Sequence, residues 1–393
     1  MELTKRQEEG LRISVQRYRN KEKYTVISGY AGTGKSTLVK FIVEALGVDP
    51  DVDVAYCAFT GKAAQVLISK GCYNATTVHK LIYTAIPKSD GSFSFKKKDE
   101  LEYKIIIVDE CSMLPRTMMN TLLSYPEVYV IFCGDPGQLP PVDKDQDNHL
   151  LDHPHVFLDE IMRQAQDSGI IQLSMLIREG KSIDNFKSDD ALVLPKSALT
   201  TGMLEWADQI LCATNKTRIF LNEQCRQLKG FTKPVEENEK VIILANEWNT
   251  VSNKDNPLTN GCTGVLTDVR DSKFDYPKFL EIKDNSMPIL SAKFTTFEGD
   301  EFGRLNFDKQ LLLTGTKYLS PIQEYRIRRT KFIAGRVPYE LAYGYAITTH
   351  KAQGSSWPNV LVIEEGFPYN PEEHMRWAYT AVTRSEKRLV LLR

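Results

Sequence analysis

Residues 29–36 read Gly29-Tyr30-Ala31-Gly32-Thr33-Gly34-Lys35-Ser36, directly after the apolar run 24–28 and before a stretch with helical spacing of apolar residues. The order strand, glycine-rich loop, helix is that of a phosphate-binding loop, whose glycines let backbone N–H groups approach phosphates. The Lys35 ammonium reaches the β- and γ-phosphates, the Ser36 hydroxyl ligates Mg²⁺, and the positive end of the helix points at the same phosphates. This stretch therefore predicts a site for nucleotide phosphates and Mg²⁺ in an α/β fold, and it leaves open a kinase, a GTPase, a nucleotide-driven motor or a plain ATP-binding module. The residues predicted to surround the phosphates are Gly29, Ala31, Gly32, Thr33, Gly34, Lys35, Ser36 and Thr37.

The composition is that of an ordinary globular protein. The 393 residues have room for about two to three domains at roughly 100–200 residues each. No apolar window of about 18 residues exists and no apolar stretch follows Met1, so we expect a cytoplasmic protein without a membrane span or signal peptide. Seven cysteines without a Cys-x-x-Cys pair argue against a disulfide scaffold or zinc ribbon. The net charge of −1 argues against a wholly basic nucleic-acid coat, but it allows a local basic groove, for example at 96–98 or 326–331.

Strand-like apolar runs fall into two groups along the chain. The first group lies at residues 24–28, 52–58, 104–108 and 128–133, and the second at 209–214, 360–363 and 388–392. Near-continuous apolar character is typical of parallel strands that are buried on both faces. The sequence thus predicts two α/β sheets.

Two stretches between these runs differ in texture. Residues 240–335 are rich in Asn, Asp, Gly and Pro, with short alternating runs at 264–269 and 279–283, which favours a small β insert. Residues 83–102 contain a Pro, Asp and Gly turn followed by polar and apolar alternation, as in a β-hairpin. We therefore expect one domain in residues 1–155, including the hairpin at 83–102, a second in 156–239 and 336–393, and the β insert at 240–335.

Acidic and amide side chains follow two of the predicted strands. Asp109 and Glu110 come directly after the run 104–108, and open α/β sheets place their ligand sites at such strand ends. Asp109 can share Mg²⁺ with Ser36, while Glu110 can polarise the attacking water. Gln138 follows the next strand and offers both donors and an acceptor, which suits a sensor of the γ-phosphate or its water. Downstream of a phosphate loop, this set predicts nucleotide hydrolysis.

The segments 29–36, 109–113 and 134–142 resemble motifs I, II and III of superfamily 1 helicases, particularly the RecD-like and Dda-like branch. The resemblance extends over most of the chain. Further segments are similar to the Q motif at 3–7, motif Ia at 59–64, motif Ib at 75–79, motif IV at 158–164, motif IVa from 213, motif V at 343–354 and motif VI at 377–384.

The resemblance implies an architecture and site residues. Its fold has two RecA-like parallel-sheet domains, with a β-hairpin pin in the first and an SH3-like β insert in the second. Gln7 would read the adenine edge, Gly354 would lie at the nucleotide, and Arg163 and Arg384 would stabilise charge on the γ-phosphate. The residues implied to contact nucleic acid are Thr60, Lys62, Thr77, His79, Phe93, Phe95, Asn215, Thr349 and His350. The histidines and the phenylalanines in this set have open alternatives. Both histidines could be structural, and both phenylalanines could pack in an ordinary hairpin.

The resemblance also implies a function. We expect an ATP-dependent DNA helicase that moves 5′-to-3′ on single-stranded DNA, acts on forked duplexes and works as a monomer in a bacterial or phage-infected cell. Replication or recombination proteins are its expected protein partners. Two alternatives stay open: a translocase that displaces proteins without separating strands, and a nucleotide-switched clamp. The set of Lys35, Asp109, Glu110, Gln138 and Arg384 argues against the clamp, since a clamp has no need to arrange hydrolysis.

Overall fold

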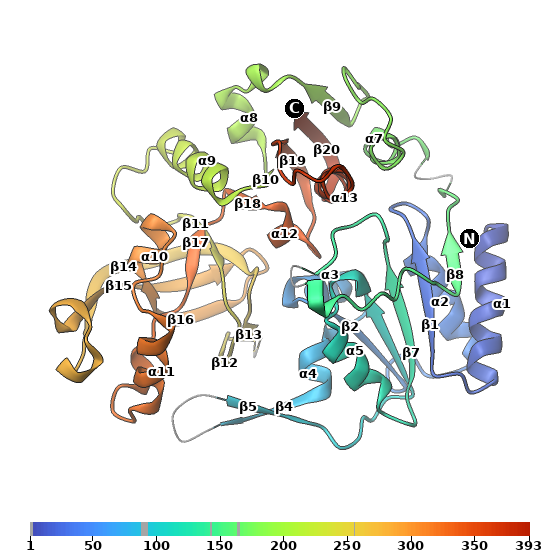
Figure 1. Ribbon diagram of the computed structural model, residues 1–393, viewed down its shortest axis with the longest axis horizontal. Coiled ribbons are helices and arrows are strands. Elements are labelled where there is room, and N and C mark those ends of the chain that lie inside the picture. The colour runs from blue at the N-terminus through green and yellow to red at the C-terminus, as the bar shows by residue number, and fades with distance from the viewer. Residues whose placement is uncertain (1–2, 88–92, 142–143, 163–165, 255) are drawn as a thin grey trace. The chain divides into compact units, whose positions relative to one another are not determined.

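The computed structural model describes residues 3–87, 93–141, 144–162, 166–254 and 256–393 (Figure 1). The chain divides into two units. The first contains Met1–Tyr83, Lys97–Thr214 and Ile347–Arg393, and the second contains Thr84–Lys96 and Asn215–Ala346. Within the described ranges, no helix has both the length and the apolar character needed to cross a bilayer.

A six-stranded sheet forms the first half of the first unit, in the order β3-β2-β6-β7-β1-β8. Every neighbouring pair is parallel. The strands are β1 (Tyr24–Gly29), β2 (Val54–Ala58), β3 (Thr76–Thr77), β6 (Ile105–Asp109), β7 (Tyr129–Gly134) and β8 (Val156–Leu158). Parallel pairing brings their carboxyl ends to one edge, where the motif residues lie.

Helices cover both faces of this sheet (Figure 1). They are α1 (Lys5–Arg19), α2 (Lys35–Leu46), α3 (Gly61–Ser69), α4 (Val78–Ile82) and α5 (Arg116–Leu123). On one face Leu38 and Ile42 of α2 pack against Ile131, and on the other Leu81 and Leu122 belong to a separate apolar cluster. Burial on both faces explains why the strands read as continuous apolar runs.

A second sheet belongs to the same unit, in the order β18-β10-β19-β20-β9. The pairs β10–β19, β19–β20 and β20–β9 are parallel. The strands are β9 (Ala191–Leu194), β10 (Gln209–Cys212), β18 (Ala346–Thr348), β19 (Trp357–Ile363) and β20 (Ser385–Leu392), with helices α7 (Gly169–Arg178), α8 (Thr201–Trp206), α12 (Thr349–Ala352) and α13 (Pro371–Val382). The predicted fold class, two parallel α/β sheets, is confirmed.

The second unit contains an antiparallel sheet in the order β16-β15-β14-β11-β17. Its strands are β11 (Lys240–Ile243), β14 (Thr263–Asp275), β15 (Ser286–Thr296), β16 (Glu301–Asp308) and β17 (Leu341–Tyr343), accompanied by α9 (Asn215–Leu228), α10 (Lys309–Thr314) and α11 (Pro321–Arg329). Two short pairs complete the strands: β12 (Glu247–Val251) with β13 (Pro257–Leu258), and the hairpin of β4 (Tyr83–Pro87) with β5 (Phe93–Lys97).

The structure differs from the sequence-based expectations at three places. β8 begins at Val156 and pairs with β1, so the first sheet extends past the expected boundary at 155. Helix α9 groups with the second unit, because Arg226 ion-pairs with the fully buried Glu239 at 2.8 Å. Residues 279–283 form no strand: the backbone of Glu281 turns left-handed at φ 54° between two 3₁₀ turns.

Candidate functional site

The loop between β1 and α2 has a backbone that only glycine tolerates at two positions. Gly32 and Gly34 both have φ +78°, the left-handed region that side chains rarely adopt. A Cβ on Gly34 would also lie 2.3 Å from Met162 Sδ and 2.4 Å from Gln7 Nε2. Gly34 is the N-cap of α2, so the free N–H groups of the first helical turn open toward the loop, as an anion site requires.

We expect Gly34→Ala to destabilise the protein more than Gly47→Ala. Both glycines have positive φ, and a left-handed alanine costs about 1–2 kcal/mol per residue. A Cβ on Gly47 meets no atom within 4 Å, whereas one on Gly34 clashes. Calorimetric melting of both variants measures the difference, and equal losses in Tm would contradict the tight packing described for Gly34.

Lys35 folds back over the loop. Its Nζ donates to the carbonyl oxygens of Gly29 at 2.6 Å and Tyr30 at 3.0 Å. The Tyr30 carbonyl also accepts from the Thr33 hydroxyl at 2.8 Å, while Thr37 lies in the first turn of α2. The ammonium group is therefore held at the loop, where phosphate oxygens would be stronger, charge-assisted acceptors.

The amide of Gln7 braces this loop. Its Nε2 donates to the carbonyls of Thr33 and Gly34, both at 3.3 Å, and its Oε1 accepts from Thr4 N at 3.0 Å. Gln7 is only 1% exposed. Its amide N–H groups and its oxygen already have protein partners, so the structure places Gln7 as a link between α1 and the loop, which differs from the implied adenine contact.

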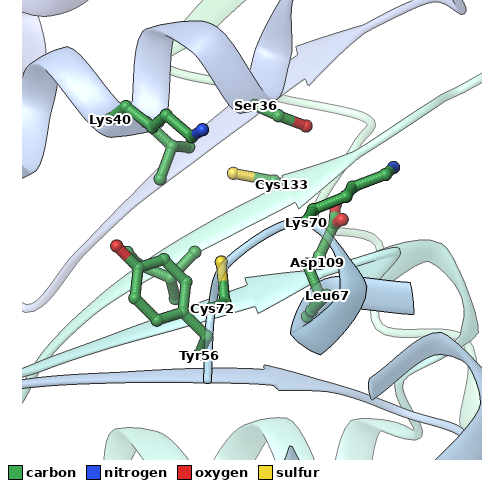
Figure 2. Close-up of a pocket in the computed structure, with 10 residues that line it drawn as sticks. Ser36, Lys40, Tyr56, Leu67, Lys70, Cys72, Asp109 and Cys133 are labelled. Atoms are coloured by element: carbon green, nitrogen blue, oxygen red, sulfur yellow. The ribbon is translucent and has the colours of Figure 1, made fainter. Parts of the chain in front are cut away.

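A cavity of about 280 Å³ lies beside the loop (Figure 2). Ser36 from the start of α2 and Asp109 from the end of β6 both line it, together with Lys70. Burial, and then the neighbouring Glu110 carboxylate, raises the pKa of Asp109. A hydroxyl and a carboxylate facing one space fit Mg²⁺, which proteins hold through one or two carboxylates together with substrate phosphates and water.

We expect Asp109→Asn to raise the Tm of the nucleotide-free protein by about 1–3 °C at pH 8. A carboxyl whose folded pKa lies above its ordinary value opposes folding once pH exceeds that ordinary value, so the gain should shrink toward pH 4. Asp53→Asn is the control: Lys104 lowers the pKa of Asp53, so losing that charge should not stabilise. Tm measured across this pH range for both variants checks the sign.

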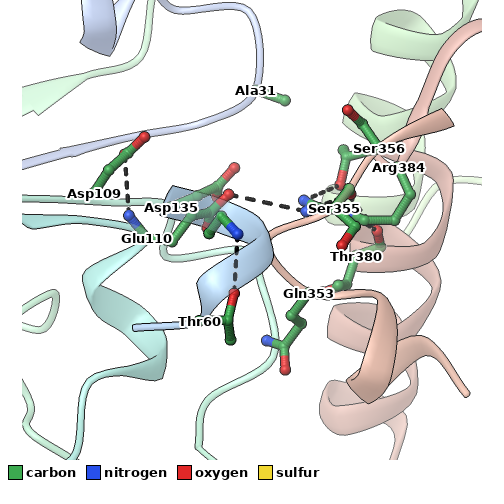
Figure 3. Close-up of polar contacts among 12 residues, drawn as sticks. Ala31, Thr60, Asp109, Glu110, Asp135, Gln353, Ser355, Ser356, Thr380 and Arg384 are labelled. Atoms are coloured by element: carbon green, nitrogen blue, oxygen red, sulfur yellow. Dashed lines mark hydrogen bonds and ion pairs between the residues drawn. The ribbon is translucent and has the colours of Figure 1, made fainter. Parts of the chain in front are cut away.

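Glu110, Gln138 and Arg384 form one polar cluster. Figure 3 shows Glu110 and Arg384 of this cluster. Arg384 Nη1 lies 3.9 Å from Glu110 Oε1. With its amide oriented to suit its neighbours, Gln138 donates to Glu110 Oε2 at 2.9 Å and accepts from Arg384 Nη2 at 3.0 Å. Glu110 itself has φ 52° and ψ 44°, an uncommon left-handed backbone for a non-glycine residue. Strained backbone of this kind often occurs at functional sites.

Arg384 is held in place by three further contacts. Its Nε donates to Thr380 O at 3.1 Å, Nη1 to Ser355 O at 3.4 Å and Nη2 to Thr383 Oγ1 at 3.2 Å. The side chain is 5% exposed. Arg384 follows α13, a helix beside the second sheet. Its guanidinium nevertheless contacts Glu110 and Gln138, which follow β6 and β7 of the first sheet. The cluster can therefore polarise a water molecule and neutralise developing phosphoryl charge in one place.

The other two expected nucleotide residues have different outcomes. Arg163 lies outside the described residues. Gly354 has φ +72°, and a Cβ there would lie 2.8 Å from Ala63 Cβ and 3.1 Å from Thr60 Oγ1. Gly354 thus packs against the start of α3.

Two of the expected nucleic-acid residues cap helices. Thr60 Oγ1 accepts from Ala63 N at 3.1 Å, and Thr77 Oγ1 accepts from Lys80 N at 3.2 Å. Each hydroxyl keeps its proton for another acceptor, such as a phosphate oxygen. Their strands β2 and β3 are neighbours, with Ala58 opposite Thr77, so both residues lie at one end of the sheet.

Three more residues expected to contact nucleic acid are His79, His350 and Thr349, and the two histidines differ from the threonine. Burial lowers the pKa of both histidines, so the imidazoles are neutral near pH 7 and act as hydrogen-bonding groups without charge. His79 also packs on Tyr83, with ring centroids 4.9 Å apart. For Thr349 the expected nucleic-acid contact is wrong. The residue is 0% exposed and its hydroxyl donates to Cys212 O at 3.5 Å, so a nucleic-acid strand could not reach that hydroxyl in this conformation.

The remaining expected contacts are less constrained. Lys62 lies in the first turn of α3, and Asn215 is the exposed first residue of α9, where its Oδ1 accepts from Arg218 Nε at 3.1 Å. Phe95 is 41% exposed on β5. Phe93 begins the same strand, and its side chain lies outside the described part of the structure.

Sequence reasoning missed three residues that join the two sheets near this cluster. Tyr379, Thr380 and Asp135 bond across the two sheets: Tyr379 donates to Asp135 Oδ2 at 2.7 Å, and Leu139 N donates to Thr380 Oγ1 at 2.9 Å. All three are within the quoted segments 134–142 and 377–384. Only their wide separation in sequence hid the contacts.

Comparisons with known proteins agree with this geometry. Residues 2–192 match the family described as "AAA domain", and residues 343–392 match "UvrD-like helicase C-terminal domain". The ATP-dependent RecD2 DNA helicase of Deinococcus radiodurans is 26% identical over 92% of this chain and 46% of its own length. The ATP-dependent DNA helicase dda of Enterobacteria phage T4 is 29% identical over 46% of this chain and 43% of its own.

A solved structure shares the fold. It is Pif1 helicase from Bacteroides in complex with ADP-AlF3 and ssDNA, with a TM-score of 0.55, 17% identity and coverage of 100% of this chain and 92% of that one. The match spans 46% of the length of RecD2 and 43% of the length of Dda, which is less than half of either relative. The ordered motifs, the two parallel sheets and these matches make the chain similar to superfamily 1 helicases of the branch that contains RecD and Dda.

Proposed function

We propose that the chain is an ATP-dependent DNA helicase that moves along single-stranded DNA in the 5′-to-3′ direction and separates the duplex ahead of it. The observation that carries this proposal is the position of Arg384, which follows a helix of the second sheet and lies beside Glu110 and Gln138 of the first. A hydrolytic centre divided between two sheets ties ATP turnover to their relative movement. RecD2 and Dda, which this chain resembles, are both named ATP-dependent DNA helicases.

Each residue has a proposed task in hydrolysis. Lys35 and the loop N–H groups bind the phosphates, and Ser36 and Asp109 would hold Mg²⁺, which when bound neutralises phosphate charge. Glu110 takes the proton of the attacking water, and Gln138 fixes both Glu110 and the water. Arg384 stabilises the charge that develops on the transferred phosphoryl group.

We propose that single-stranded DNA passes the N-termini of α3 and α4, which Thr60 and Thr77 cap. Thr60 and Thr77 offer hydroxyl donors, and His79 and His350 offer neutral imidazole groups. Such groups bond the phosphate backbone and carry no sequence information. We therefore expect binding that tolerates any sequence, as movement along a strand requires.

Strand separation is assigned to the hairpin of β4 and β5. Phe95 is 41% exposed on β5, an apolar surface that could wedge against a base pair. The turn of the hairpin, residues 88–92, lies outside the described residues. A translocase without this wedge activity is the competing function.

Tailed duplexes test the proposal. With ATP, we expect release of a labelled strand from a duplex that carries a 5′ single-stranded tail, and little release from one with only a 3′ tail. RNA versions of the same substrates show whether the strand is recognised as DNA. ATP hydrolysis without strand release from either tail would reduce the function to that of a translocase, and release from the 3′ tail alone would overturn the direction.

We propose that the enzyme acts as a monomer in the cytoplasm of a bacterial or phage-infected cell, where ATP and DNA are both present. Single-stranded DNA and forked duplexes are its proposed partners. Proteins of replication, recombination or repair are further proposed partners, because each of these processes exposes single strands.

A further inference from the structure

One hydroxyl group joins the phosphate loop to the second sheet. Ala31 N donates to Tyr379 Oη at 2.9 Å, and the Tyr379 hydroxyl donates to Asp135 Oδ2 at 2.7 Å. The Ala31 amide can only donate, so the Tyr379 hydroxyl oxygen accepts this bond. The hydroxyl proton is then available for the Asp135 carboxyl group. Asp135 Oδ1 in turn accepts from Gly137 N at 2.9 Å. The relay thus connects α13, the loop after β7 and the phosphate loop.

The two side chains of the relay are buried, while Ala31 on the loop is half-buried. Tyr379 is 1% exposed and Asp135 2%. Gly137 lies flat on the Tyr379 ring, where an added Cβ would come within 2.9 Å of Cε1, and the Tyr30 ring meets it edge-on with centroids 6.5 Å apart. Removing the buried hydroxyl would therefore leave the Ala31 amide without its protein partner.

Two residues outside α13 also contact this edge of the first sheet: Gln353 Nε2 donates to Leu139 O at 2.7 Å, and the Arg178 guanidinium of α7 lies 3.6 Å from the centre of the Tyr30 ring. Helix α13 and the residue that follows it add further contacts. Thr380 accepts from Leu139 N at 2.9 Å, and Arg384, just beyond the helix, lies 3.9 Å from Glu110. Figure 3 shows Thr380 and Arg384 on the helix side, facing Glu110 and Asp135, with Ala31 on the loop above. Arg178 meets the side chain of Tyr30, whereas Tyr379 is the α13 residue that bonds the backbone of the phosphate loop. A displacement of α13 would therefore break the Ala31 bond at the same time as it withdraws Arg384.

We propose that Tyr379 is a positioning residue that keeps the phosphate loop in its ATP-binding shape only while α13 is docked on the first sheet. This rests on the proposed function, because it gives ATP affinity a dependence on the position of the second sheet. Arg384 acts on the bound phosphate, whereas Tyr379 acts earlier, on the loop that receives it. ATP would then bind tightly in the docked arrangement and loosely when the sheets part, as a motor needs for product release.

Tyr379→Phe is the test, because it keeps the buried ring and removes only the oxygen. Hydrogen exchange of the Ala31 amide in the nucleotide-free protein should accelerate at least about ten-fold, the factor expected for one buried hydrogen bond to a neutral partner. Affinity for a non-hydrolysable ATP analogue, measured by calorimetry, should fall by about the same factor. Steady-state kinetics should show this as a raised KM, with kcat within about three-fold of the unmodified chain.

Tyr129→Phe is the matched control. Tyr129 is 5% exposed, and its hydroxyl bonds Thr25 Oγ1 of β1 at 2.5 Å and Ser14 O of α1 at 3.4 Å. It should show a similar loss of Tm with unchanged exchange at Ala31 and unchanged analogue affinity. If Tyr379→Phe behaves like this control, the proposal is overturned. Absence of ATP turnover in the unmodified chain would instead overturn the proposed function, while the exchange measurement still decides whether Tyr379 holds the loop.

Discussion

Arg384→Ala should lower kcat for ATP hydrolysis by on the order of 10³-fold and leave the affinity for ATP nearly unchanged. The physical reason is that the guanidinium has most value when charge develops on the γ-phosphate, and its Nη1 and Nη2 already face Glu110 and Gln138. Single-turnover phosphate release, together with binding of a fluorescent ATP analogue, separates the two quantities.

Two further variants make this test specific. Arg384→Lys keeps the charge but cannot reproduce the planar group that meets Thr380 O, Ser355 O and Thr383 Oγ1, so it should recover only part of the rate. Arg376→Ala removes an arginine from the same helix that pairs with Glu372 at 3.1 Å on the surface, and its rate should stay within about two-fold. Equal losses for Arg384→Ala and Arg376→Ala would show that the effect comes from the helix and leave Arg384 without the proposed role.

Glu110→Gln should lower kcat by about 10²–10⁴-fold, the usual contribution of a general base. The amide keeps the shape of the side chain and can still contact Gln138, but it cannot accept the proton of the attacking water. ATP should therefore bind normally and remain intact. Rapid filtration of bound radiolabelled ATP, followed by chromatography of the nucleotide, measures both outcomes.

Lys35→Ala gives the opposite pattern and serves as the comparison. It removes the ammonium that lies over the Gly29 and Tyr30 carbonyls, so ATP affinity and turnover should both fall, whereas DNA binding should be largely retained. If Glu110→Gln also loses ATP affinity, Glu110 holds the loop or the metal in place and is not the base.

Features that are local in sequence could be predicted well. The phosphate loop, the acidic pair and the Gln138 segment each follow an apolar run, and the rule that ligand sites lie at the carboxyl ends of parallel strands brings them to one edge. The roles of Gly32 and Gly34 also follow from local geometry, since their φ of +78° permits little else.

Features that depend on distant packing could not be predicted. The strand β8 is three residues long and has no pattern of its own, and only its pairing with β1 makes it a strand. Thr349 is polar and follows a strand, as an exposed contact residue would, but neighbouring elements bury it completely. The bond between Ala31 and Tyr379 spans 348 positions, and its partners carry no local signal of each other.

Gln7 is another residue whose role depends on distant packing. The segment 3–7 resembles a motif whose glutamine reads adenine, yet Gln7 lies in the first turn of α1, and its amide bonds Thr4 in the capping box and the phosphate loop. The choice between base recognition and a structural brace depends on which acceptors surround a buried amide, and those acceptors come from a loop more than one element away.

The dependence of ATP turnover on single-stranded DNA tests the central claim most directly. Steady-state phosphate release, measured at saturating ATP and low salt with and without an unstructured oligonucleotide, should rise at least about ten-fold with DNA, because a strand across both sheets favours the arrangement that brings Arg384 to the phosphate. The stimulation should disappear in Arg384→Ala. A rate that is the same with and without DNA, in a protein that binds both ATP and the oligonucleotide, would contradict the account.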